Sequence, residues 1–247
     1  MNRLITIPFS HYCEKARWAL EYAGVPFQEE GHVPIFHWRA SYGVGGGRTV
    51  PVLTTDEGVL RDSTDILHFA DRAAPANRKL YGSPEVEALE DLFDKKLGPA
   101  TRRVAYYFMM PHPEMMRPIF GRSVPRLEAG LISLFFPLVV KVIKRGLKID
   151  EAGAQKSIAR VHEIFATVGE RLKDGRRFLD GESFSAADLT FASLAAPVIF
   201  PEQHPVTFRE VSALPPEVRG LVTELRESPA GKFARRMYAE ERRPHHA

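Results

Sequence analysis

Ser10 and Cys13 lie three residues apart near the N-terminus and are the first side chains that could take part in thiol chemistry. The good helix formers at 14–22 place both residues at the beginning of a predicted helix, where the helix dipole favours an anion. A hydroxyl there can donate a hydrogen bond to a thiolate and help lower the pKa of a thiol, ordinarily about 8.5. By local sequence alone, a simpler role is favoured, in which Ser10 caps the helix.

Cys13 is the only cysteine of the chain, so no intrachain disulfide can form and a reducing compartment is expected. Ser10 stands where a Cys-X-X-Cys motif has its attacking cysteine, which excludes intramolecular dithiol exchange. A mechanism that uses Cys13 alone stays open. A single cysteine among apolar helical residues is more often a small buried hydrophobe, and we expect Cys13 to be inert.

Two further motifs follow within the first seventy residues. Val50-Pro51 begins a short apolar run, where a proline suits the start of an edge strand. The sequence by itself predicts a trans bond, because only about 5–6% of X-Pro bonds in folded proteins are cis. Asp62-Ser63 precedes apolar residues at helical spacing, so either residue can cap a helix. The amides at such a helix N-terminus can also hold a carboxylate.

Short secondary-structure elements must position these motifs. Strands are predicted at 4–8, 27–31, 50–54 and 59–60, and helices at 14–22, ended by Gly24, and at 63–72. The glycine-rich segment 32–48 is expected to be an irregular surface loop. This order implies a parallel crossover at the start and a hairpin at the end.

The remainder of the chain is predicted to be helical. A connection rich in helix breakers around 74–84 marks the expected boundary between a first domain, 1–76, and a second, 85–247. The predicted helices are 85–109, 128–148, 151–172, 185–199, 216–227 and 229–241. Ser185 and Asp188 have the spacing of a capping box, which gives Asp188 a structural rather than a catalytic role.

Composition limits the classes of function. The 247 residues suit two domains, and the net charge of +3, from 34 basic and 31 acidic residues, does not indicate nucleic-acid binding. The apolar run before Pro8 is too short for a signal peptide. These features predict a cytoplasmic protein.

The layout and motifs together resemble the cytosolic glutathione S-transferase superfamily, in particular its serine-type, bacterial-like members. The resemblance covers nearly the whole chain and is carried by the segment 8–20 with Ser10, by the two motifs at 50–51 and 62–63, and by the segment 178–189. It implies an N-terminal thioredoxin-like domain of order β-α-β-α-β-β-α, followed by a C-terminal helical bundle.

The resemblance also assigns roles to residues. Ser10 would activate glutathione. Val50, before a cis Pro51, would bind the cysteinyl part through its backbone, and Asp62 and Ser63 would hold the γ-glutamyl end. Glutathione would be a co-substrate, no metal would be needed, and the protein would be a homodimer. Nothing local distinguishes Arg17 or Arg48 as a partner of the glycyl carboxylate.

The second substrate is expected to be a small hydrophobic electrophile, as in detoxification. Tyr106, Tyr107 and Met110 belong to an aromatic and methionine cluster that could line its pocket. Ordinary helical core explains the same cluster equally well.

The segment 131–143 is nearly all apolar, contains Pro137 and is followed by basic residues. It is too short to span a bilayer, which needs about 20 residues. A buried central helix is the ordinary interpretation. An alternative is contact with an anionic membrane surface, or with a hydrophobic partner, through residues 131–148.

Three functions remain open from the sequence. The favoured one is a transferase that joins the glutathione thiolate to an electrophile. A glutathione-dependent thiol transferase or isomerase is the first alternative, and a non-catalytic binding protein of the same fold is the second.

Overall fold

A computed structural model describes residues 1–206 and 210–242 of the chain. Its contacts form two compact units, which are described separately. The first comprises Met1–Lys79 and Pro113–Gly146, and the second comprises Leu80–His112 and Leu147–Ala247. The contacts therefore group 113–146 with the N-terminal residues, whereas the sequence predicted a second domain running without interruption from 85 to 247.

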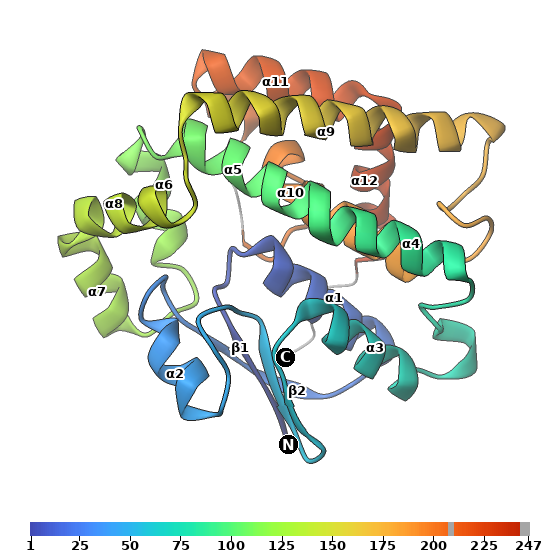
Figure 1. The fold of residues 1–247 in the computed structure, drawn as a ribbon, viewed down its shortest axis with the longest axis horizontal. Coiled ribbons are helices and arrows are strands. Elements are labelled where there is room, and N and C mark those ends of the chain that lie inside the picture. Colours follow the sequence, from blue (N-terminus) through green and yellow to red (C-terminus); the bar gives the residue numbers. More distant parts are fainter. Residues whose placement is uncertain (207–209, 243–247) are drawn as a thin grey trace. The chain divides into compact units, whose positions relative to one another are not determined.

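A four-stranded mixed sheet forms the centre of the first unit. Its strands are β1 (Asn2–Thr6), β2 (Phe27–Gly31), β3 (Val52–Thr55) and β4 (Gly58–Leu60), in the order β2-β1-β3-β4 (Figure 1). β1 is parallel to β2 and antiparallel to β3, and β3 is antiparallel to β4. The predicted crossover and hairpin are confirmed.

Two helices connect strands of this sheet, and a third follows the last strand. They are α1 (His11–Ala23), α2 (His37–Gly43) and α3 (Ser63–Ala73), and α1 packs against α3. α1 ends as predicted at Gly24, whose φ of 72° lies in the left-handed region. The expectation of an irregular segment 32–48 is wrong for its middle third, where α2 forms. The order β-α-β-α-β-β-α, implied by the resemblance, is confirmed.

Residues 113–146 form three short helices: α6 (Pro113–Phe120), α7 (Arg126–Leu134) and α8 (Phe136–Gly146). The predicted single helix 128–148 is wrong, because the chain leaves helical geometry at Phe135, with φ −97° and ψ 15°. Pro137 lies in the first turn of α8, where the missing N–H costs nothing, whereas the interior of a longer helix excludes it. α6 had no counterpart in the sequence prediction.

The interpretation of 131–143 as a buried central helix is also wrong. Ile132, Phe136 and Val139 are buried, but Leu134, Phe135, Leu138 and Val142 are exposed. Each short helix therefore buries one side only.

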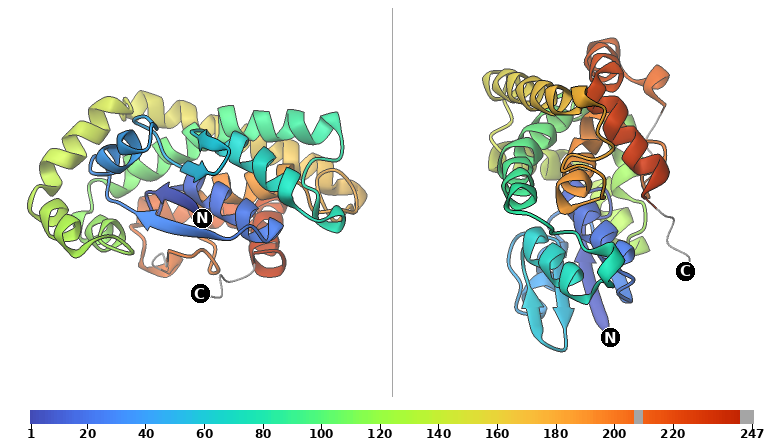
Figure 2. Two further views of the ribbon diagram at one scale, coloured as in Figure 1. Left: turned by 90° about the horizontal axis from the view of Figure 1, so that it is seen from below. Right: turned by 90° about the vertical axis from the view of Figure 1, so that its right-hand side faces the viewer.

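The second unit is helical, as predicted. Its helices are α4 (Pro84–Leu92), α5 (Gly98–Met109), α9 (Glu151–Arg171), α10 (Ala186–Ile199), α11 (Pro216–Glu227) and α12 (Pro229–Glu240). A π-helical turn at Phe93–Leu97 joins α4 to α5, so the predicted helix 85–109 is continuous but not α-helical throughout. α9 lies alongside α5 and α12 (Figures 1 and 2).

α10 is the core of the second unit. All of its residues except Pro197 are buried, and it contacts α4, α5, α11 and α12. The Phe191 ring on α10 packs on Phe93, Phe165 and Phe233, with ring centroids 5.1, 5.4 and 6.1 Å away. A helix that is apolar all round belongs at the centre of a bundle, which explains this position.

Candidate functional site

The topology of the first unit brings the three N-terminal motifs to one edge of the sheet. Ile5, near the end of β1, pairs with Val52 at the beginning of antiparallel β3, and Leu53 pairs with Leu60 at the end of β4. Residues that follow β1 and β4 therefore emerge at the same edge as residues that precede β3. Ser10, Val50-Pro51 and Asp62-Ser63 occupy these three positions.

Ser10 is the N-cap residue of α1, but its side chain does not cap the helix. The Ser10 carbonyl accepts the first intrahelical hydrogen bond, from the Glu14 amide at 2.8 Å, and the Ser10 amide donates to Ile7 O in the preceding turn at 2.9 Å. The half-buried hydroxyl is instead in hydrogen-bond contact with the Cys13 thiol. The simpler interpretation, in which the Ser10 side chain only caps the helix, is therefore wrong, because the hydroxyl makes no capping hydrogen bond.

Cys13 is a fully buried free thiol. Burial raises its pKa to about 12, although hydrogen bonds to Ile7 and Ser10 act in the opposite direction. A thiol with this pKa is almost wholly protonated at neutral pH. The expectation that Cys13 is a buried small hydrophobe is confirmed.

The peptide bond between Val50 and Pro51 is cis. The expectation from sequence alone, a trans bond, is wrong, and the geometry implied by the resemblance is confirmed. α2 fixes the preceding loop: His37 Nε2 and Trp38 Nε1 lie 2.9 and 3.1 Å from the Arg48 carbonyl. The helix that local sequence did not predict therefore supports the segment before Val50.

Asp62 and Ser63 begin α3. Asp62 Oδ1 accepts a hydrogen bond from the Thr64 amide at 2.8 Å, which confirms the predicted cap, and the residue is otherwise exposed. Ser63 is 3% exposed. The first amides of an eleven-residue helix thus face the same sheet edge as Ser10, and such amides attract a carboxylate.

Lys15 is a residue at this edge that the sequence did not single out. It is fully buried, and its Nζ donates to Thr64 Oγ1 at 3.0 Å, which joins α1 to the first turn of α3. A lysine in an amphipathic helix is usually solvated, so the residue type did not indicate that Lys15 is buried. Its contact with Thr64 makes it a positioning residue for the Asp62-Ser63 turn.

Arg17 does not face the candidate site as a free cation. Its guanidinium binds Glu14 Oε2 at 2.5 Å and Glu29 Oε1 at 2.6 Å, and the Arg17 and Glu14 side chains are buried. Burial alone would raise the pKa of Glu29, but the hydrogen bond from Arg17 and its charge lower it overall. Arg17 is thus part of a structural ion-pair network beneath the site.

Aromatic side chains connect the site edge to the segment 113–146. The ring of Phe9, next to Ser10, meets Phe120 edge-on at 4.7 Å, and Phe120 meets Phe136 at 5.8 Å. This aromatic cluster was not predictable from the sequence, because Phe9 and Phe120 are 111 positions apart in the chain and no periodicity relates them.

The residues proposed for the electrophile pocket belong to the second unit. Tyr106 and Tyr107 are half-buried on α5, and Met110 is buried just after it. Burial raises the pKa of Tyr106 to about 12, so its hydroxyl is protonated at neutral pH. Their assignment to a pocket stays a prediction.

Within residues 1–206 and 210–242, no group of three or more His, Cys, Asp or Glu side chains is arranged to hold a metal ion. In the same residues, no helix is both long and apolar enough to cross a bilayer.

The chain matches two models of one family. Residues 4–78 match the N-terminal domain of glutathione S-transferases, and residues 151–220 match the C-terminal domain. Comparison with curated protein sequences gave no match.

Solved structures agree over nearly the full length of the chain. Glutathione transferase F7 from Populus trichocarpa has 17% identity and a TM-score of 0.56, over 99% of this chain and 100% of that one. A Ceriporiopsis subvermispora glutathione S-transferase, solved in complex with glutathione, has 15% identity and a TM-score of 0.62, over 100% and 99%. The β-etherase LigF from Sphingobium sp. strain SYK-6 has 16% identity and a TM-score of 0.58, over 94% and 98%. At 15–17% identity, this structural similarity shows a shared fold.

The two family models and the thioredoxin-like and helical architecture define the class of protein. The chain belongs to the glutathione S-transferase superfamily. The family binds glutathione, and a glutathione-using, transferase-like role follows for this chain.

Proposed function

We propose that the protein is a serine-type glutathione transferase that joins the glutathione thiolate to a small hydrophobic electrophile. The observation that carries the proposal is the convergence of Ser10, cis-Val50-Pro51 and Asp62-Ser63 at one sheet edge, beside the N-termini of α1 and α3. A tripeptide with a thiol and two carboxylates suits this combination of a hydroxyl, backbone groups and two helix N-termini.

Each motif has one part of glutathione to bind. The Val50 backbone would pair with the cysteinyl residue, as a strand pairs with its neighbour. The Ser63 hydroxyl and the first amides of α3 would hold the γ-glutamyl carboxylate, and the Asp62 carboxylate, exposed at the cap, would pair with the γ-glutamyl ammonium. Charge-assisted bonds of this kind are the strong ones in ligand recognition.

Ser10 supplies the chemistry by stabilising the thiolate. The glutathione thiol loses its proton to solvent, and the Ser10 hydroxyl donates to the resulting sulfur anion while the α1 dipole adds to the stabilisation. Each unit of pKa lowering corresponds to about 1.4 kcal/mol. The sulfur then forms a bond to carbon, and the displaced group leaves with the electron pair of the broken bond.

The electrophile is proposed to lie against apolar side chains. The proposed residues are Tyr106, Tyr107 and Met110 of the second unit, because aromatic and methionine side chains adapt to varied hydrophobic ligands. Because one structural neighbour is a β-etherase, hydrophobic ethers belong in the first substrate screen.

Two variants test the catalytic assignment. Ser10→Ala removes the hydroxyl but leaves the backbone hydrogen bonds of residue 10 in place, so we expect kcat/KM for conjugation to fall about 100-fold, as when one donor to a developing anion is lost. The melting temperature should hardly change. Cys13→Ala is the matched control and should retain conjugation, because the native thiol is buried and protonated.

The outcomes separate the candidate functions. A thiol transferase that uses Cys13 would fail in Cys13→Ala and survive in Ser10→Ala, which would contradict the proposal. A binding protein without turnover would conjugate nothing in either form. The homodimer and the cytoplasmic location implied by the resemblance are part of the proposal; sedimentation and cell fractionation test them.

A further inference from the structure

The hairpin of α7 and α8 exposes an apolar surface. The described residues include seven exposed large hydrophobic side chains, and five of them lie in this hairpin, between 42% and 74% exposed: Leu127, Leu134, Phe135, Leu138 and Val142. We call these five side chains the hairpin surface. Single exposed apolar residues are ordinary, but five within the sixteen positions 127–142 are a local concentration that favours a site of interaction.

The helices that carry the hairpin surface are packed against the first unit through their opposite sides. Glu128 on α7 binds His32 Nδ1 through Oε1 at 2.8 Å and accepts from the Val33 amide through Oε2 at 3.1 Å. On α8, the buried Phe136 ring packs on Phe120, and the Arg117 guanidinium lies 5.4 Å from the Phe136 ring centre. The inner side is thus anchored to the first unit, and the outer side is free for another role.

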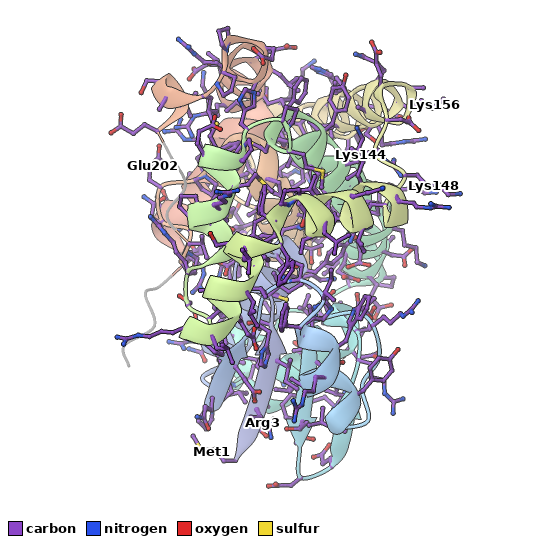
Figure 3. All side chains as sticks on the ribbon, turned by 90° about the vertical axis from the view of Figure 1, so that its left-hand side faces the viewer. Met1, Arg3, Lys144, Lys148, Lys156 and Glu202 are labelled. Carbon is purple, nitrogen blue, oxygen red and sulfur yellow. The ribbon has the colours of Figure 1, made fainter. Side chains whose placement is uncertain are left out.

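Basic residues accompany the apolar ones. Lys141, Lys144 and Arg145 are exposed on α8, where Lys144 extends from the surface (Figure 3). Leu138 and Val142 are four residues apart, as are Lys141 and Arg145, so the two pairs form adjacent rows on one exposed side of the helix. Residues 129–149 contain no Asp or Glu, so no acidic side chain of this segment offsets their charge.

We propose that the hairpin surface docks on an anionic lipid bilayer. Apolar side chains beside lysine and arginine are the composition of helices that lie in the membrane interface, because the apolar groups enter the acyl boundary and the bases meet lipid phosphates. The nine and eleven residues of α7 and α8 correspond to about 14 and 17 Å. These helices would therefore lie in the plane of the interface.

A second copy of the chain is a poorer occupant. A two-fold interface uses the same patch on both subunits, so it would bury the bases Lys141, Lys144 and Arg145 of both copies, and residues 129–149 contain no acidic side chain to pair with them. Like charges brought together in this way are unfavourable. An anionic bilayer offers acyl chains to the apolar side chains and lipid phosphates to the basic ones.

Co-sedimentation with vesicles tests the proposal on the full chain. We expect binding to phosphatidylcholine vesicles that contain roughly 30% phosphatidylserine at low salt, little binding to pure phosphatidylcholine, and loss of binding as salt rises. Lys141→Gln/Lys144→Gln should weaken partitioning about 25-fold, at roughly fivefold for each basic residue near the surface. Leu134→Ser/Leu138→Ser should weaken it more than about tenfold.

Lys173→Gln/Lys232→Gln is the matched control, because it removes the same net charge from exposed lysines of the second unit. It should partition like the wild type. The substituted side chains are all exposed, and unchanged melting temperatures would verify folding.

Three results would overturn the proposal. They are no binding of the wild type to anionic vesicles at low salt, equal binding to neutral vesicles, and binding that the hairpin variants do not weaken. Sedimentation velocity identifies the competing occupant: a dimer that Leu134→Ser/Leu138→Ser converts to monomer, without vesicle binding, would assign the surface to a second copy.

Discussion

Asp188 should be a determinant of stability rather than of catalysis. It is fully buried in the second unit, where Oδ1 accepts from the Leu179 amide at 2.7 Å and Oδ2 from the Ser185 amide at 2.8 Å and the Ser185 hydroxyl at 2.6 Å. It thus closes the predicted capping box of α10 and also fixes the loop before that helix.

The cost of Asp188→Ala follows from these contacts. Two buried amides lose their partner, and each unsatisfied buried donor costs about 1–3 kcal/mol. The Ser185 hydroxyl can rotate toward another acceptor and adds little. We expect the free energy of unfolding to fall by about 3–5 kcal/mol. Ser185→Ala removes only the hydroxyl contact and should cost about 1 kcal/mol.

Urea unfolding monitored by circular dichroism measures both variants, and glutathione conjugation by the folded fraction is measured in parallel. A loss of less than about 1 kcal/mol in Asp188→Ala would refute the hydrogen-bond argument. Normal stability with abolished turnover would instead show a catalytic role.

The pH dependence gives an independent check of the same site. Burial raises the pKa of Asp188 from 3.8 to about 6, against the hydrogen bonds from Leu179 and Ser185. A raised carboxyl pKa means that the folded state binds the proton more tightly, so this contribution to stability is present at low pH and is lost as pH rises through 6. Between about pH 4 and 7 the wild type should lose about 3 kcal/mol relative to Asp188→Asn, at 1.36 kcal/mol per unit.

Three predictions concern the first unit. Gly31→Ala should destabilise the protein by about 1–3 kcal/mol, because a Cβ there would lie 2.3 Å from the Ser123 carbonyl oxygen; a neutral effect in urea unfolding would contradict that contact. Burial would lower the pKa of His32, but hydrogen bonds to Glu128 and Glu30 raise it overall. The protonated His32 side chain should therefore stabilise the folded state fully below about pH 6.5, and this stabilisation should be lost as the pH rises through the raised pKa. His32→Gln should lack that decline in unfolding measurements across this range, and an unchanged profile would dismiss the ion pair. Cys13, with its pKa of about 12, should react with iodoacetamide far more slowly in the native protein than in urea; equal rates would show an accessible thiol.

Much of the first unit could be predicted because its signals are local. Strand 27–31, the stop of α1 at Gly24 and the cap at Asp62 depend on residues within a few positions of one another. The capping box at Ser185 was predictable for the same reason. The parallel crossover and the final hairpin were predictable from the order of the elements and the lengths of the connections between them.

The missed features depend on contacts distant in sequence. The burial of Lys15 depends on its contact with Thr64, and which side of α8 is exposed depends on the packing of Phe136 against Phe120. Periodicity shows that a helix has an apolar side, but it does not show whether another part of the chain covers that side. The cis bond at Pro51 was expected only from the resemblance, since residue type alone favours trans.

The most direct test of the proposed glutathione site is a calorimetric titration of the purified protein with glutathione. The wild type should bind saturably, and Ser63→Ala should bind about 10- to 100-fold more weakly through loss of one charge-assisted hydrogen bond. Ser133→Ala, at an exposed position of α7, is the control and should bind normally, and melting curves verify folding of both variants. Absence of binding by the folded wild type would contradict the assignment of Ser10, Val50, Asp62 and Ser63.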